Sequence, residues 1–92
     1  MTLHNRKITF IGGGNMASAI ITGLLKKNFS PSQILVTDPN THQTQKLEHQ
    51  FKIKTSTNNK EGFEFGDLLI LAVKPQVMLP ILQEMQSLEI HK

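Results

Sequence analysis

A short apolar segment that runs directly into three consecutive glycines sets the framework of this chain. Residues 7–11 are rich in β-branched and aromatic side chains, which predicts a strand. The run Gly12-Gly13-Gly14 predicts a tight turn at the end of this strand. Beyond the turn, apolar residues recur at helical spacing from Ala17 to Leu25, so we expect a helix over residues 15–27. A strand, a glycine turn and a helix in this order are typical of an α/β unit.

The rest of the chain also alternates between strands and helices. Apolar periodicity and turn residues predict strands at residues 34–37, 53–55 and 68–73, a helix at 41–51 and a brief helical turn after Asn58. Apolar residues at helical spacing from Met78 to Met85 predict a last helix that ends near residues 86–88. The uninterrupted apolar run at 68–73 is typical of a central parallel strand, and Pro80 fits the last helix if it lies in the first turn. Crossover rules give the strand order 3-2-1-4. We therefore expect one α/β domain with an open parallel sheet, spanning residues 1–92.

Two of the expected helix starts carry the sequence signature of a capping box. Asn40 is placed to cap the helix over residues 41–51, and Gln43 follows at the position that completes the box. Asn58 and Glu61 repeat the pattern before the brief helical turn, which a glycine weakens. Both helical segments are therefore expected to begin directly after an asparagine that serves as the N-cap.

The glycine turn carries a phosphate-binding motif. Residues 12–17 match the pattern G-x-G-x-x-A between a strand and a helix. Gly12 allows the tight turn, Gly14 lets a pyrophosphate approach the backbone, and Ala17 keeps the helix close to the strand. The N–H groups at the start of the helix would hold the anion. The alternative is a glycine turn that binds no ligand.

Two further segments follow the ends of predicted strands. Asp38 ends the second strand, where a carboxylate can accept hydrogen bonds from the hydroxyl groups of an adenosine ribose. Alternatively, Asp38 only caps the turn at Pro39. Residues 72–75 end the last strand, at the sheet edge where open parallel sheets bind ligands. Lys74 alone is also compatible with a charge exposed to solvent.

The composition argues against several classes of protein. The absence of cysteine removes disulfides, thiolate nucleophiles and thiolate metal sites, and a reducing cytoplasm fits best. The net charge is +3, but the lysines are scattered and no Trp or Tyr is present to stack bases, so we expect no nucleic-acid partner. No segment is long and apolar enough for a membrane span. No nucleophile, base and orienting group come together, so we expect neither a catalytic residue nor a metal site.

The glycine block and the last strand together resemble the N-terminal domain of pyrroline-5-carboxylate reductases. Residues 10–17 resemble the opening block of that family, with further similarity at residues 19–21 and 23–24. Residues 67–76 resemble its second block at a similar spacing, and the resemblance extends over residues 7–85. It implies a Rossmann-type NAD(P)-binding fold with NADP as the cofactor, NAD also being possible.

The resemblance completes the set of expected cofactor-binding residues. Residues 72–75 would border the cofactor on its nicotinamide side, and Asn59 is similar to a family position that contacts the cofactor. Without the resemblance, Asn59 is equally compatible with the first turn of a short helix. The full expected set is Ile11, Gly12, Gly13, Gly14, Asn15, Met16, Ala17, Asp38, Asn59, Ala72, Val73, Lys74 and Pro75.

In the family that this chain resembles, the reduced nicotinamide passes hydride to the imine carbon of 1-pyrroline-5-carboxylate and yields L-proline. The family continues into further strands and a helical C-terminal domain that makes the dimer, whereas this sequence stops at Lys92. We therefore expect a cofactor-binding portion that is inactive alone and forms homo-oligomers through the exposed edge at 68–73. Two alternatives remain open: the cofactor domain of another small-substrate reductase, and a non-catalytic nucleotide-binding or interaction module.

Overall fold

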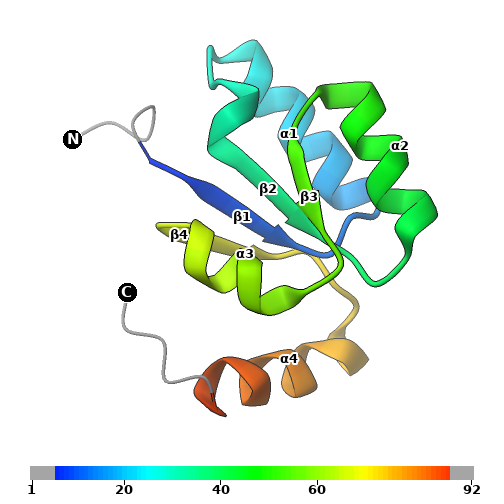
Figure 1. Cartoon of the computed structure of the whole chain (residues 1–92), viewed down its shortest axis with the longest axis vertical. Coiled ribbons are helices and arrows are strands. Elements are labelled where there is room, and N and C mark those ends of the chain that lie inside the picture. The colour runs from blue at the N-terminus through cyan, green and yellow to red at the C-terminus, as the bar shows by residue number, and fades with distance from the viewer. Residues whose placement is uncertain (1–5, 88–92) are drawn as a thin grey trace.

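A parallel sheet lies at the centre of the structure, a computed structural model that describes residues 6–87 (Figure 1). Its strands are β1 (Ile8–Ile11), β2 (Ile34–Thr37), β3 (Lys54–Ser56) and β4 (Leu68–Leu71), in the order β3-β2-β1-β4. Every neighbouring pair is parallel. The predicted α/β class and strand order are confirmed, although the third strand begins one residue late and the fourth ends at Leu71 rather than at residue 73.

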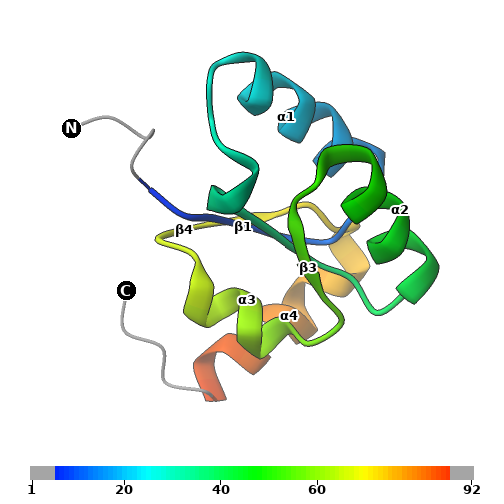
Figure 2. The same ribbon diagram turned by 45° about the horizontal axis from the view of Figure 1, so that its top comes forward.

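Helices cover both faces of this sheet. They are α1 (Asn15–Lys26), α2 (Thr41–Phe51), α3 (Asn59–Phe65) and α4 (Pro75–Ser87), and a short 3-10 helix, η2 (Pro31–Gln33), precedes β2. Figures 1 and 2 show α1 and α2 on one face and α3 and α4 on the other. Between residues 6 and 87, no helix is long and apolar enough to cross a membrane.

Successive side chains of the strands point to opposite faces, and this separates the buried residues into two cores. In β1, Ile8 and Phe10 belong to the larger core, whereas Ile11 belongs to the smaller core with Phe63 of α3 and Ile81 of α4. The buried members of the larger core are Ile8, Phe10, Ala17, Ile21, Phe29, Ile34, Val36, Leu47, Ile53 and Ala72.

The strand β4 lies at the edge of the sheet within the described residues, where it pairs only with β1. Leu68 is 41% exposed and the rest of the strand is half-buried. Its uninterrupted apolar run is typical of a central strand, but among the described residues β4 has a neighbouring strand on one side only. The exposed apolar edge that we expected is present.

The first helix cap is present at Asn40, but its capping box does not form. Oδ1 of Asn40 accepts a hydrogen bond from the N–H of His42 at 2.9 Å. The side-chain amide of Gln43 donates to the carbonyl of Gly13 instead of reaching back to the cap. The N–H of Asn40 donates to Oδ1 of Asp38 at 2.9 Å, so both groups that would close the box bond elsewhere, and the bond of Gln43 connects α2 to the glycine loop.

The second cap, at Asn58, behaves in the same way. Its Oδ1 accepts from the N–H of Lys60 at 2.9 Å, while its own N–H donates to Oγ of Ser56 at 3.0 Å. Glu61 therefore has no box bond to complete, and the predicted box is wrong here too. The helical turn itself is longer than expected and forms the whole of α3.

Gly62 lets α3 lie unusually close to the sheet. A Cβ atom at this position would stand 2.7 Å from Cγ2 of Thr37 and 2.8 Å from Cγ2 of Thr9. The hydroxyl of Thr9 donates to the carbonyl of Gly62 at 2.7 Å, which satisfies a polar group inside the core. The glycine that weakens the helix by propensity is required by this packing.

Pro80 lies inside α4 and not in its first turn, because the helix begins at Pro75. The predicted placement of Pro80 is therefore wrong. A proline at this position removes the bond that its N–H would make to the carbonyl of Gln76. Burial of Ile81 in the smaller core holds this part of the helix against the sheet.

Candidate functional site

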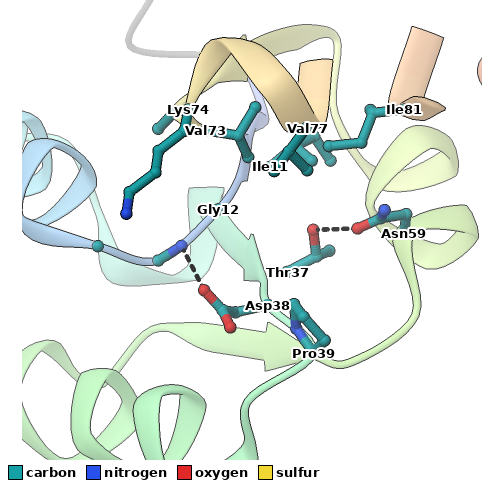
Figure 3. A pocket seen from close by; sticks show the side chains of 13 residues that line it. Ile11, Gly12, Thr37, Asp38, Pro39, Asn59, Val73, Lys74, Val77 and Ile81 are labelled. Atoms are coloured by element: carbon teal, nitrogen blue, oxygen red, sulfur yellow. Dashed lines mark hydrogen bonds between the residues drawn. The ribbon is translucent and has the colours of Figure 1, made fainter. Parts of the chain in front are cut away.

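A pocket of about 370 Å³ opens at the carboxyl ends of β1, β2 and β4. The ends of these strands, the start of α3 and the first half of α4 enclose it (Figure 3). Its lining residues are Ile11, Gly12, Gly13, Gly14, Thr37, Asp38, Pro39, Asn59, Ala72, Val73, Lys74, Val77 and Ile81. This edge is where open parallel sheets bind ligands.

Gly12 makes the tight turn that the motif predicts. Its φ angle is +105°, a conformation that side chains rarely adopt. Its N–H donates to the carbonyl of Thr37 at 2.8 Å, and a Cβ atom would stand 2.4 Å from the carbonyl oxygen of Ala72. The turn therefore lies between the ends of β2 and β4, the two strands that flank β1, with no room for a side chain.

Gly14 is the N-cap residue of α1 and faces open space. No heavy atom lies within 4 Å of the position that its Cβ would occupy, and no side chain caps the helix. The next residues, Asn15 and Met16, are exposed, whereas Ala17 is fully buried beneath the helix start. The first N–H groups of a helix lack partners within it, so this end of α1 presents donors and a partial positive charge to an anion.

Asp38 ties the glycine loop to the turn that follows β2. Its Oδ2 accepts the N–H of Gly13 at 2.9 Å, and its Oδ1 accepts the N–H of Asn40 at 2.9 Å. Gln43 donates to the carbonyl of the same glycine from the other side. The capping role that we considered for Asp38 is thus present, and each carboxylate oxygen keeps a second lone pair for a ligand.

Asn59, the first residue of α3, is held from two sides. Its Oδ1 accepts the hydroxyl hydrogen of Thr37 at 2.7 Å, as Figure 3 shows, and its Nδ2 donates to Oε1 of Glu84 at 3.2 Å. These bonds join the end of β2, the start of α3 and the last turns of α4. The carboxamide therefore lines the pocket in a defined orientation.

Lys74 stands at the mouth of the pocket, after the end of β4. Its side chain extends toward the glycine loop in Figure 3, and it makes no hydrogen bond or ion pair with the part of the chain that the structure describes. Pro75, next in sequence, begins α4 and does not line the pocket. An unpaired ammonium group near an open helix start favours an anionic ligand.

Nine of the thirteen predicted residues line this pocket. The four that do not are Asn15, Met16, Ala17 and Pro75. The first three belong to the start of α1, directly after the glycines that line the pocket. The lining residues that the sequence reasoning missed are Thr37, Pro39, Val77 and Ile81.

The missed residues differ in how they could have been found. Thr37 and Pro39 flank Asp38, so adjacency alone points to them. Val77 and Ile81 are spaced by one helical turn at the start of α4, which places them on one face next to the end of β4. Glu84 carries no sequence signal, because its bond to the pocket depends on how α4 packs.

Comparison with known proteins places the chain among oxidoreductases. Residues 7–92 match the family described as NADP oxidoreductase, coenzyme F420-dependent. The pyrroline-5-carboxylate reductase of Pasteurella multocida is 40% identical over 90 residues, which is 95% of this chain and 33% of the relative. That of Haemophilus influenzae is 38% identical over 87 residues, 95% of this chain and 32% of the relative. The chain thus spans about a third of the length of the curated relatives it matches.

Solved structures give the same result for the fold. A pyrroline-5-carboxylate reductase from Coxiella burnetii is 31% identical with a TM-score of 0.87, and the match covers 95% of this chain and 32% of that one. The Plasmodium falciparum enzyme, with NADP bound, has a TM-score of 0.75 at 22% identity and covers 94% of this chain and 30% of that one. The predicted Rossmann-type fold is therefore confirmed.

Proposed function

Because this chain belongs to the family described as NADP oxidoreductase, coenzyme F420-dependent, we propose that it binds a nicotinamide dinucleotide as the cofactor-binding portion of a pyrroline-5-carboxylate reductase. The observation that carries the proposal is the pocket at the carboxyl ends of the strands, beside the open start of α1. The named relatives favour pyrroline-5-carboxylate over coenzyme F420 as the substrate. Bound NADPH would supply the hydride for the C=N bond, whose nitrogen gains a proton in the product L-proline.

The geometry fits such a cofactor along its length. Gly14 leaves space over the first N–H groups of α1 for the pyrophosphate, and Lys74 adds a positive charge there. Asp38 offers an acceptor after the end of β2 and Asn59 offers a donor at the start of α3, where we propose that the adenosine ribose binds. Val73 and its neighbours would border the nicotinamide side, as in the family that the sequence resembles.

The choice between NADP and NAD depends on the carboxylate of Asp38. A negative charge repels a 2′-phosphate but accepts a hydrogen bond from a free 2′-hydroxyl. Two backbone N–H groups already bond to Asp38, which disperses part of its charge, and Lys60 is an exposed cation next to Asn59 in the first turn of α3. We therefore propose NADP as the cofactor with NAD also accepted.

We further propose that residues 1–92 form one N-terminal domain and that this domain self-associates through β4. The length of the relatives and the unpaired edge of β4 in the described residues support both statements. An edge strand with apolar side chains pairs readily with another strand. Cytoplasmic location remains a prediction.

Calorimetric titration of the 92-residue chain with NADPH and NADH tests cofactor binding. We expect saturable, weak binding of both and no oxidation of NADPH when pyrroline-5-carboxylate is added. A chimera tests the larger proposal: residues 7–87 of this chain replace the matching region of the Haemophilus influenzae relative. Restored NADPH oxidation that depends on pyrroline-5-carboxylate supports the proposal. Absence of cofactor binding by a folded chain, or a folded chimera that binds NADPH but reduces nothing, contradicts it.

A further inference from the structure

Glu84 is joined to the pocket by hydrogen bonds that cross three elements. The hydroxyl of Thr37 donates to Oδ1 of Asn59, and Nδ2 of Asn59 donates to Oε1 of Glu84. Thr37 is 1% exposed, and the other two side chains are half-buried. Glu84 lies outside both sequence blocks that point to the site and does not line the pocket itself.

The direction of these bonds follows from the charge of Glu84. A carboxylate has no hydrogen to donate, so it faces Nδ2 rather than Oδ1 of the Asn59 carboxamide. Oδ1 then faces Thr37, whose hydroxyl can donate or accept and here must donate. The two ends of a carboxamide have nearly the same shape. Without the carboxylate, Asn59 would therefore fit equally well in the reversed orientation, with Thr37 accepting.

Nδ2 of Asn59 carries a second hydrogen, for which the described residues provide no acceptor. Asn59 lines the pocket, so this hydrogen is available to a ligand. We propose that Glu84 is a positioning residue, which orients Asn59 so that this N–H is offered to an oxygen of the adenosine ribose or of its 2′-phosphate. This inference rests on the proposed function, because it needs a dinucleotide in the pocket.

The sign of the effect separates positioning from simple electrostatics. Glu84→Gln removes a negative charge near an anionic ligand, so charge alone would strengthen binding. Positioning predicts the opposite, because a neutral glutamine can present either end to Asn59 and no longer selects one orientation. Glu61→Gln is the matched control, since it removes an exposed carboxylate from the first turn of α3 that makes no bond to Asn59.

Calorimetric titration of the folded chain provides the first test. Glu84→Gln is expected to lower the affinity for NADPH about 3- to 10-fold, the range for one weakened hydrogen bond to the ligand. Glu61→Gln should leave it unchanged or slightly higher. Adding Glu84→Gln to Asn59→Ala should cause no further loss, since nothing remains to be oriented. A loss that is equal for NADH assigns the acceptor to the ribose, and a larger loss for NADPH assigns it to the 2′-phosphate.

NMR spectra of the ligand-free chain provide a second test that does not need a cofactor. One Nδ2 proton of Asn59 should be shifted downfield by the carboxylate, and Glu84→Gln but not Glu61→Gln should reduce that shift. The inference is overturned if Glu84→Gln binds NADPH as tightly as the unmodified chain or more so, if its loss adds to that of Asn59→Ala, or if this resonance does not move. Failure of the unmodified chain to bind either cofactor would contradict the proposed function, while the resonance still reports whether Glu84 orients Asn59.

Discussion

Gly12→Ala is expected to lower stability and Gly14→Ala to lower cofactor affinity, although the two glycines lie in the same loop. At Gly12, a φ angle of +105° costs a residue with a side chain about 1–3 kcal/mol. The new Cβ would stand 2.4 Å from the carbonyl oxygen of Ala72 and 2.8 Å from Cγ1 of Val73, and such overpacking costs about 1–3 kcal/mol more. The lower entropy of the unfolded chain offsets only about 0.4–1 kcal/mol. We therefore expect Gly12→Ala to lower the free energy of unfolding by about 3 kcal/mol.

Gly14→Ala causes neither backbone strain nor steric overlap. Its φ angle of −81° suits alanine, and no atom lies within 4 Å of the added methyl group, so stability should change by less than about 1 kcal/mol. The same methyl group would occupy the space over the first N–H groups of α1. We expect the affinity for NADPH to fall about tenfold or more, which corresponds to about 1.4 kcal/mol or more.

Urea unfolding followed by far-ultraviolet circular dichroism measures both stabilities, and equal slopes for the variants show that the same surface unfolds. A loss for Gly12→Ala of under about 1 kcal/mol would refute the close approach to Ala72, because the overlap alone should cost that much. NADPH titration of folded Gly14→Ala tests the predicted loss of cofactor affinity. Binding as tight as that of the unmodified chain would show that the pyrophosphate does not approach this glycine.

Four further predictions follow from the packing, charge and open edge of the structure. Gly62→Ala should lower stability by about 2 kcal/mol in urea unfolding despite the better helix propensity of alanine; a gain would show that the sheet yields at Thr37. Lys74→Met should weaken NADPH binding and make it less dependent on salt, and an unchanged salt dependence in calorimetry would argue against a phosphate contact. Asp38→Ser should raise the NADPH/NADH affinity ratio; a constant ratio would show that Asp38 does not face the ribose. Light scattering should detect dimers or larger species at micromolar concentration that Leu68→Lys reduces, whereas a monomer at all concentrations would contradict pairing through β4.

The sheet could be predicted from the sequence because its signals are local. Most strands are short apolar runs that end at a turn residue, and crossover rules together with the strand order of dinucleotide-binding domains then give the arrangement of the strands. The glycine motif is local as well, since a strand, a turn and a helix in succession place Gly12 and Gly14 without knowledge of the rest. This is why the pocket contains most of the residues that the sequence predicts.

The errors arise where a side chain chooses between a local and a distant partner. Gln43 has a local partner in the capping box, yet it donates to Gly13, which only the folded sheet brings near. Glu84 is bonded to Asn59 although 25 residues separate them. Gly62 weakens its own helix, but two threonines of the sheet leave no room for a side chain at this position. Propensity and motif rules describe neighbours along the chain, so they cannot predict these tertiary contacts.

The position of Asp38 couples cofactor choice to the order of the glycine loop. The carboxylate that would repel a 2′-phosphate is also the acceptor that holds the N–H of Gly13. A substitution that removes the charge to favour NADPH therefore also removes a charge-assisted bond that keeps the loop in place. Gln43 still holds the carbonyl of Gly13 in such a variant, so Gly13 loses one of the two side-chain hydrogen bonds described above rather than both. Because both cofactors need the loop for their pyrophosphate, its loosening weakens NADPH and NADH alike, and only the ratio of the two affinities isolates the effect of the charge on the ribose.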